Sequence, residues 1–231
     1  MANAALTSLQ FKISPIGQGP VLSLNEERRV SIWHSSSHLG LDRATWISSP
    51  QDLVFAESGG SYRKIADDKI LVREHNRKWC RNRLNDLLKD RGIQLGSVKT
   101  VFLLFGGNDC APPRPYKEDP PFDLDLSLAG AVSLKEFYLW RFPHAHIVFC
   151  SVVPRHFDSS DLSDAFNENR KALNSGLALN VKEGRCHYVD LWPTGIPRGN
   201  FTMGGVHLRS AAHYGELILR PAVEWVNSQQ W

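Results

Sequence analysis

The stretch T-V-F-L-L-F-G-G-N-D, residues 100–109, constrains the fold of this 231-residue chain more than any other. Residues 101–105 form an unbroken apolar run, which is typical of a strand covered on both faces in a parallel sheet. Two glycines end the run and allow a sharp exit of the chain. Asn108 and Asp109 then fall at the carboxyl end of the strand, the edge where open α/β sheets bind their ligands. The stretch predicts such a sheet with polar groups at that edge; an Asn-Asp turn without chemical function is the alternative.

Four other apolar segments have the character of strands, and helical patterns separate them. The predicted strands are residues 30–33, 53–56, 101–105, 146–153 and 186–191. The predicted helices cover residues 67–91, 126–142, 162–183 and 210–227, with Gly92 and Gly184 as C-terminal stops. This alternation predicts an α/β fold, a three-layer sandwich around a five-stranded, mostly parallel sheet.

The first 28 residues contain prolines and glycines that interrupt any periodic pattern. We therefore expect an N-terminal extension over residues 1–28 and a single domain over residues 29–231. The N-terminus lacks a charged start followed by a long apolar core, so neither a signal peptide nor a membrane span is expected. The four cysteines show no C-x-x-C spacing, and free thiols indicate a reducing compartment, which favours a cytoplasmic location.

The charge pattern does not point to nucleic acid as a partner. Lys and Arg outnumber Asp and Glu by 27 to 24, a net charge of +3. The basic segment at residues 73–83 is interpreted as the solvated face of a helix. The histidines show no ligand spacing with carboxylates, so no metal and no cofactor are predicted. The sequence gives no prediction of the oligomeric state.

Small and polar residues follow three predicted strands and precede the last predicted helix. They are the serines at 35–37, Gly59 and Gly60, the group at 107–109, and His207. A serine, a histidine and N–H donors at one edge of a sheet are the parts that acyl transfer requires. The hydroxyl becomes a nucleophile when a base takes its proton, and the donors stabilise the oxyanion that follows.

These segments resemble the four blocks of the SGNH/GDSL hydrolase superfamily, whose Ser, Gly, Asn and His occur in this chain order. V-S-I-W-H-S-S-S-H-L (30–39) is similar to the first block and puts Ser37 at the nucleophile position. F-A-E-S-G-G-S-Y (55–62) and F-G-G-N-D (105–109) put Gly60 and Asn108 at the oxyanion-donor positions. G-G-V-H-L (204–208) puts His207 at the position of the base.

The resemblance implies a flavodoxin-like SGNH hydrolase fold and a serine esterase or deacetylase acting on a small acyl ester. The oxyanion hole would consist of Ser37, Gly60 and Asn108. S-V-V-P-R (151–155) and N-E-N-R-K-A-L-N (167–174) also resemble a retroelement-encoded, esterase-like subgroup. The loop at residues 111–125, rich in proline and acid, is expected to shape the substrate entrance.

Two departures from the family pattern bear on activity. Ser35 and Ser36 replace the usual Gly-Asp before the nucleophile, and Gly204 replaces the acid that orients the histidine. Loss of the correct histidine tautomer costs about ten-thousand-fold in a serine protease triad. A Ser–His dyad, or a substitute acid at Asp109 or Asp190, would preserve the chemistry.

Two other functions remain alternatives to an active esterase. A catalytically impaired SGNH-fold binding module would follow from the missing acid. A nucleotide-binding flavodoxin-like domain ranks last, because no Gly-x-Gly-x-x-Gly sequence follows the first strand.

Overall fold

A five-stranded sheet forms the centre of the protein. The computed structural model describes residues 11–12, 23–24, 30–35, 53–56, 60–66, 84–113, 120–193, 195–203 and 205–229. The strands are β3 (Val30–Ser35), β4 (Leu53–Ala56), β5 (Val98–Leu104), β6 (His146–Cys150) and β7 (Cys186–Val189). Their order is β4-β3-β5-β6-β7, and every neighbouring pair is parallel. The predicted α/β fold with a five-stranded, mostly parallel sheet is confirmed.

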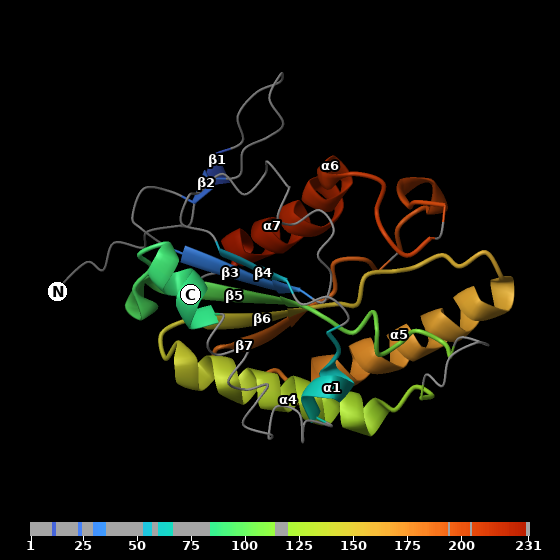
Figure 1. The fold of residues 1–231 in the computed structure, drawn as a ribbon, viewed down its shortest axis with the longest axis horizontal. Coiled ribbons are helices and arrows are strands. Elements are labelled where there is room, and N and C mark those ends of the chain that lie inside the picture. The colour runs from blue at the N-terminus through green and yellow to red at the C-terminus, as the bar shows by residue number, and fades with distance from the viewer. Residues whose placement is uncertain are drawn as a thin grey trace.

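Helices cover both faces of this sheet, as Figure 1 shows. One face is covered by α1 (Tyr62–Ala66), α4 (Leu124–Arg141) and α5 (Ser160–Asn180). The other face is covered by α6 (Ala211–Tyr214), a π-helical segment (Gly215–Leu219) and α7 (Arg220–Ser228). Residues 84–90 are also helical. Within the predicted extension, β1 (Phe11–Lys12) pairs antiparallel with β2 (Ser23–Leu24).

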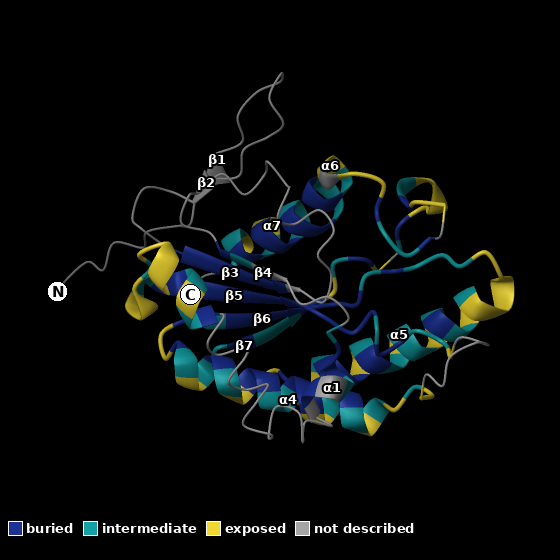
Figure 2. Cartoon of the chain, viewed as in Figure 1, coloured by how far each residue is buried: buried dark blue, intermediate teal, exposed yellow. Residues whose placement is uncertain are grey.

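The apolar run of β5 contributes to both layers of the core. Val101, Leu103 and Phe105 belong to the hydrophobic cluster shared with α4 and α5. Phe102 and Leu104 belong to the cluster under the C-terminal helices. All five residues are buried, and Figure 2 shows β5 coloured as buried between the two helical layers. Successive residues of the strand enter the core on opposite faces of the sheet, and this is the structural reason that its sequence is continuously hydrophobic.

Two predicted strands extend too far at their carboxyl ends. The predicted strand at residues 146–153 corresponds to β6, which ends at Cys150. The Val152 N–H donates to Asn174 Oδ1 (2.9 Å), a side chain of α5. The Leu191 N–H donates to Ser151 Oγ (3.0 Å), and β7 ends at Val189 rather than 191. Side-chain oxygens thus accept hydrogen bonds from the N–H groups that would otherwise have continued the sheet.

The two glycine stops behave differently. Gly92 has φ +65, and the Ile93 N–H donates to the Leu88 carbonyl (2.8 Å), so it ends its helix as predicted. Gly184, with φ +55, was expected to cap the helix at 162–183, but α5 ends at Asn180. Gly184 instead forms the turn that leads into β7.

Among the residues that the structure describes, no helix has the length and apolar character needed to cross a membrane.

Candidate active site

The strand order defines where a ligand site is expected. The chain runs from β3 outward to β4 on one side and then crosses to β5 on the other side. Loops that leave β3 and β5 therefore diverge, and α/β proteins with this order bind ligands in the resulting crevice. Ser37 follows the last residue of β3 by two positions, and Asn108 follows β5 by four. Ser37 itself lies outside the described residues, so its position stays a prediction.

The structure brings Asn108 and Gly60 together. Asn108 Nδ2 donates to the Gly60 carbonyl oxygen at 2.9 Å, and Asn108 Oδ1 accepts from Arg155 Nη2 at 3.2 Å. A guanidinium can only donate and a carbonyl can only accept, so these two partners fix which side of the amide carries nitrogen. Within the described part of the chain, the second N–H of Asn108 has no partner. This geometry leaves one oriented amide donor at the carboxyl edge of β5.

Asp109 fixes the segment that carries Gly60. Its carboxylate is 1% exposed and accepts from Tyr62 N (2.9 Å), Arg63 N (2.7 Å) and Ser127 Oγ (3.3 Å). Burial raises the pKa of Asp109, while the N–H groups of Arg63 and Tyr62 oppose that shift. Both oxygens are engaged at the start of α1, which is not consistent with the predicted alternative of Asp109 orienting the histidine.

Arg155 is a site residue that sequence reasoning missed. It lies on the loop after β6, and α5 holds this loop on both sides of it. On one side, Asn174 Oδ1 accepts from Val152 N (2.9 Å); on the other, Ser163 Oγ accepts from the N–H of Phe157 (3.0 Å). The guanidinium packs 5.5 Å from the Phe166 ring centre. Burial lowers the pKa of Arg155, but an arginine stays charged at neutral pH.

Backbone hydrogen bonds shape the loop that carries His207. The Thr202 N–H donates to the His207 carbonyl (2.7 Å), and the Gly205 N–H donates to the Thr202 carbonyl (2.8 Å). A bridge between Phe201 and Leu208 closes the base of the loop. Its residues are thus held mainly by contacts within the loop.

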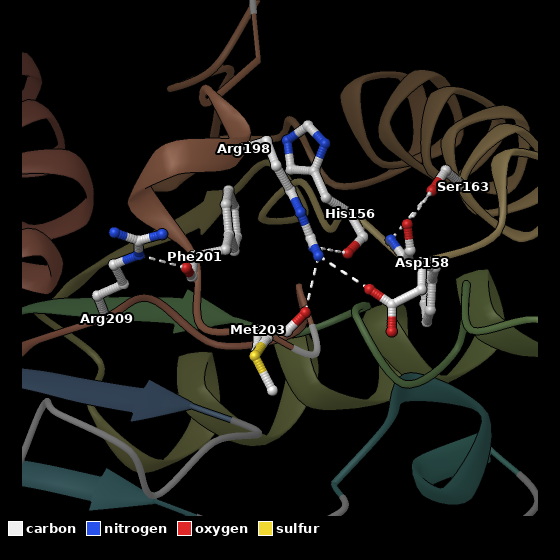
Figure 3. A network of polar contacts seen from close by, with 8 residues as sticks. His156, Asp158, Ser163, Arg198, Phe201, Met203 and Arg209 are labelled. Atoms are coloured by element: carbon white, nitrogen blue, oxygen red, sulfur yellow. Dashed lines mark hydrogen bonds and ion pairs between the residues drawn. The ribbon is translucent and has the colours of Figure 1, made fainter.

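A polar network attaches this loop to the segment after β6 (Figure 3). The His156 N–H donates to the Gly205 carbonyl (2.8 Å). Arg198 donates to the His156 carbonyl, to Met203 O (2.7 Å) and to Asp158 Oδ1 (3.0 Å). The segment that carries Arg155 and the loop that carries His207 are therefore joined directly.

His207 is half-buried, and its pKa is lowered by burial and then by the nearby Arg155 cation. No described carboxylate bonds its imidazole. Asp190, the second predicted substitute acid, is exposed and accepts from Trp192 N (3.3 Å). Gly204 lies outside the described residues. The structure therefore gives no support, within its described part, for a carboxylate that orients His207.

The structure also describes the possible metal ligands and part of the 111–125 loop. No cluster of three metal-ligating side chains occurs among the described residues. An open cavity of about 510 Å³ is lined by Arg63, by residues 120–123 at the end of the 111–125 loop, and by residues 124–126 at the start of α4. Arg63 Nη1 donates to the Pro121 carbonyl there (2.8 Å). The lining does not include Gly60, Asn108 or His207, so the role of this loop at the substrate entrance stays a prediction.

Comparison with known proteins relates the chain to solved structures by fold. No family model and no curated protein matches it. A GDSL-like lipase from Bacteroides thetaiotaomicron superposes with a TM-score of 0.55 at 16% identity, over 87% of this chain and 89% of the lipase. A carbohydrate esterase family 3 protein from Talaromyces cellulolyticus gives a TM-score of 0.52 at 11% identity, over 87% and 99%. An acetyl esterase variant crystallised with acetate gives 0.51 at 11%, over 86% and 99%. The predicted resemblance is thus confirmed at the level of fold: this chain has the fold of the SGNH/GDSL hydrolases.

Proposed function

We propose that this protein is a serine esterase that hydrolyses a small acyl ester through an acyl-enzyme on Ser37. The observation that carries the proposal is the oriented amide of Asn108, bonded to Gly60 and Arg155 at the switch point of an SGNH-type sheet. An acetyl group is the favoured acyl group, because an acetyl esterase is among the proteins that share the fold.

Ser37 is the proposed nucleophile because it leaves β3 at the same edge as Asn108 leaves β5. His207 takes the hydroxyl proton as Oγ attacks the ester carbonyl, and it later gives that proton to the departing alcohol. Water, activated by the same imidazole, then hydrolyses the acyl-enzyme. Burial and Arg155 lower the pKa of His207, which keeps the imidazole neutral and able to accept a proton at pH 7.

The oxyanion is proposed to receive the second N–H of Asn108 and the backbone N–H groups of Gly60 and Ser37. Asn108 meets the requirement that such a donor be fixed before the reaction, since both ends of its amide are already bonded. The α1 helix keeps Gly60 in place, because Asp109 binds the N–H groups of the two residues that begin it.

The decisive experiment measures release of p-nitrophenol from p-nitrophenyl acetate by the wild type and by Ser37→Ala. We expect the substitution to lower kcat by about a thousandfold or more while the far-UV spectrum and unfolding midpoint stay unchanged. Equal turnover by the two folded proteins would rule out Ser37 as the nucleophile.

A matched control is available in Ser210, an exposed serine whose Oγ lies 3.0 Å from His213 Nδ1. This pair has the contact distance of a Ser–His dyad but lies at the start of α6. Ser210→Ala should keep full activity. A loss there, with Ser37→Ala active, would move the nucleophile to this second pair.

A second variant tests the missing acid. Gly204→Asp restores the residue type that the family has three positions before its histidine. We expect kcat to rise by at least about tenfold, because a carboxylate would stabilise the imidazolium in the transition state. An unchanged kcat in the folded variant would indicate a dyad that works without a carboxylate.

A further inference from the structure

The guanidinium of Arg155 lies against Gly107, in space that a side chain at that position would share. A Cβ built on Gly107 would lie 2.6 Å from Arg155 Nη2 and 3.0 Å from its Cζ. Gly107 has no positive φ, in contrast to Gly106 with φ +97. An alanine at the second glycine of F-G-G-N-D would therefore displace the flexible end of the Arg155 side chain, whereas the backbone conformation at Gly107 does not demand glycine.

Arg155 makes a single hydrogen bond among the described residues, to Asn108 Oδ1. No ion pair with a described carboxylate accompanies it; the ion pairs found there are Lys135–Glu183, Arg198–Asp158 and Arg220–Glu216. The Asp109 carboxylate acts on Arg155 through space, but its oxygens bond Tyr62, Arg63 and Ser127 instead. Burying much of a charge without a direct ion pair costs free energy, so a guanidinium held beside Asn108 at this edge of the sheet points to a role in the site.

A charged donor on Oδ1 has two effects on the amide of Asn108. It prevents the amide from rotating by 180°, since that rotation would place an NH₂ group against the guanidinium. It also withdraws electron density from the amide, so the N–H groups on Nδ2 become stronger donors. Both effects favour an oxyanion that develops beside Nδ2.

We infer that Arg155 is a positioning residue for the oxyanion hole, because it fixes and polarises the Asn108 amide through Oδ1. The absence of a side chain at Gly107 leaves the space in which its guanidinium lies. The inference rests on the proposed esterase function. It differs from a substrate-binding role, because Arg155 would act through Asn108 and not by contact with the ester.

The first test is a double-mutant cycle on kcat and KM for p-nitrophenyl acetate. Asn108→Ala should lower kcat by about 100- to 1,000-fold, the usual effect of losing one oxyanion donor. Arg155→Ala should lower kcat by about 10- to 100-fold with KM nearly unchanged, since a small misplacement of a positioned group has effects of this size. At a pH where His207 is neutral in every variant, Asn108→Ala with Arg155→Ala should be no slower than Asn108→Ala alone, because Arg155 then acts through Asn108 only.

Two further variants complete the kinetic test. Gly107→Ala should reproduce the loss of Arg155→Ala, because its Cβ displaces the guanidinium. Arg185→Ala is the matched control, an arginine whose Nη1 donates to the Ala145 carbonyl (2.8 Å) at the amino edge of the sheet, and it should keep wild-type kcat. Multiplicative losses in the double mutant, or a raised KM with unchanged kcat in Arg155→Ala, would overturn the inference.

The second test does not depend on turnover. The side-chain amide of Asn108 gives a pair of resonances in a ¹H–¹⁵N spectrum, which Asn108→Ala assigns by their loss. Arg155→Ala should move this pair and speed its exchange with water, whereas Arg185→Ala should leave both unchanged. An unmoved Asn108 pair in Arg155→Ala would overturn the inference even in an active enzyme. If the Asn108 resonances move in Arg155→Ala but the protein shows no Ser37-dependent turnover, the positioning role of Arg155 is supported and the proposed esterase function is refuted.

Discussion

The two loops that carry Asn108 and His207 are held in place by different chemistry. Side chains fix the loop after β5: Asp109 bonds the start of α1, and Asn108 bonds Gly60 and Arg155. These bonds join residues about fifty positions apart in the chain. A loop with such contacts must keep particular side chains, and this is the reason that F-G-G-N-D is recognisable in the sequence.

Main-chain groups fix most of the loop at residues 198–209. Its internal bonds join backbone atoms of Asn200 with Arg209 and of Thr202 with Gly205 and His207. Arg198 also bonds backbone carbonyls, apart from its contact with Asp158. Backbone bonds place few demands on side chains, so the loop carries a weak sequence signal. The difference predicts that single side-chain deletions harm the first loop more than the second.

The largest effect is expected from Asp109→Ala. It would leave the buried N–H of Tyr62 and the partly buried N–H of Arg63 without their acceptor, at a cost of about 3 kcal/mol in the free energy of unfolding. Asp123→Ala is the matched control, since Asp123 also accepts from a helix N-terminus, at Leu126 N (2.9 Å), but is exposed. It should cost about 1 kcal/mol. Urea unfolding measures both, and equal costs would contradict the importance of burial.

A smaller effect is expected from Gly205→Ala, the one kind of substitution to which the second loop should be sensitive. Gly205 has φ +64, and an added Cβ would overlap the His156 carbonyl oxygen. The left-handed conformation alone costs about 1–2 kcal/mol, and the overlap must add to this or displace the loop.

Two other glycines separate these contributions. Gly195 has φ +79 but open space around a Cβ, so Gly195→Ala should show the conformational cost alone. Gly199 has open space and no positive φ, so Gly199→Ala should change stability little. Thermal unfolding should rank the three variants in this order, and a Gly205→Ala protein as stable as Gly199→Ala would contradict the packing of the loop.

The contrast between the loops also explains what could be predicted from the sequence. The central strand was predicted because β5 is apolar on both faces, and Asn108 was identified because it lies just beyond the end of that strand. The short helix α1 was missed: its five residues Y-R-K-I-A are too few for a periodic pattern, and the N–H groups of its first two residues bond Asp109, 47 and 46 positions away. Local patterns do not reveal a cap that arrives through tertiary structure.

Arg155 was missed for a related reason. The segments 151–155 and 167–174 were noted for their resemblance to a subgroup, without a role for their residues. In the structure, Asn174 from the second segment bonds Val152 in the first and so fixes the loop that carries Arg155. The partner of Arg155 lies 47 positions away in the chain, and no spacing rule connects the two. The position of Ser37 relative to His207 stays a prediction.

A third prediction concerns Arg198, the side chain that contributes most to the second loop. Its ion pair with Asp158 is exposed, with side-chain accessibilities of 43% and 83%. Arg198→Ala should therefore cost about 1 kcal/mol or less in the free energy of unfolding. A cost as large as that of Asp109→Ala would show that both loops depend on side chains, and the comparison would fail.

The smallest effect is expected in the pH dependence that links the two loops. His207 has a pKa below the ordinary value for histidine because of burial and then because of Arg155. As a general base it must be neutral, so kcat/KM should decrease on the acid side with a midpoint below pH 6.5. Arg155→Gln removes the cation that disfavours the imidazolium, so it should raise the pKa and move the acid limb to higher pH.

The shift of the acid limb distinguishes an electrostatic effect of Arg155 on His207 from a positioning effect of Arg155 on Asn108. Loss of the contact with Asn108 lowers the height of the pH profile without moving its midpoint, whereas loss of charge near His207 moves the midpoint. Arg155→Lys keeps the charge and loses the planar donor, so its profile should be lower while its midpoint stays near that of the wild type. A midpoint that moves equally in Arg155→Lys and Arg155→Gln would mean that the cation does not act on His207, and that the two loops are joined through structure alone.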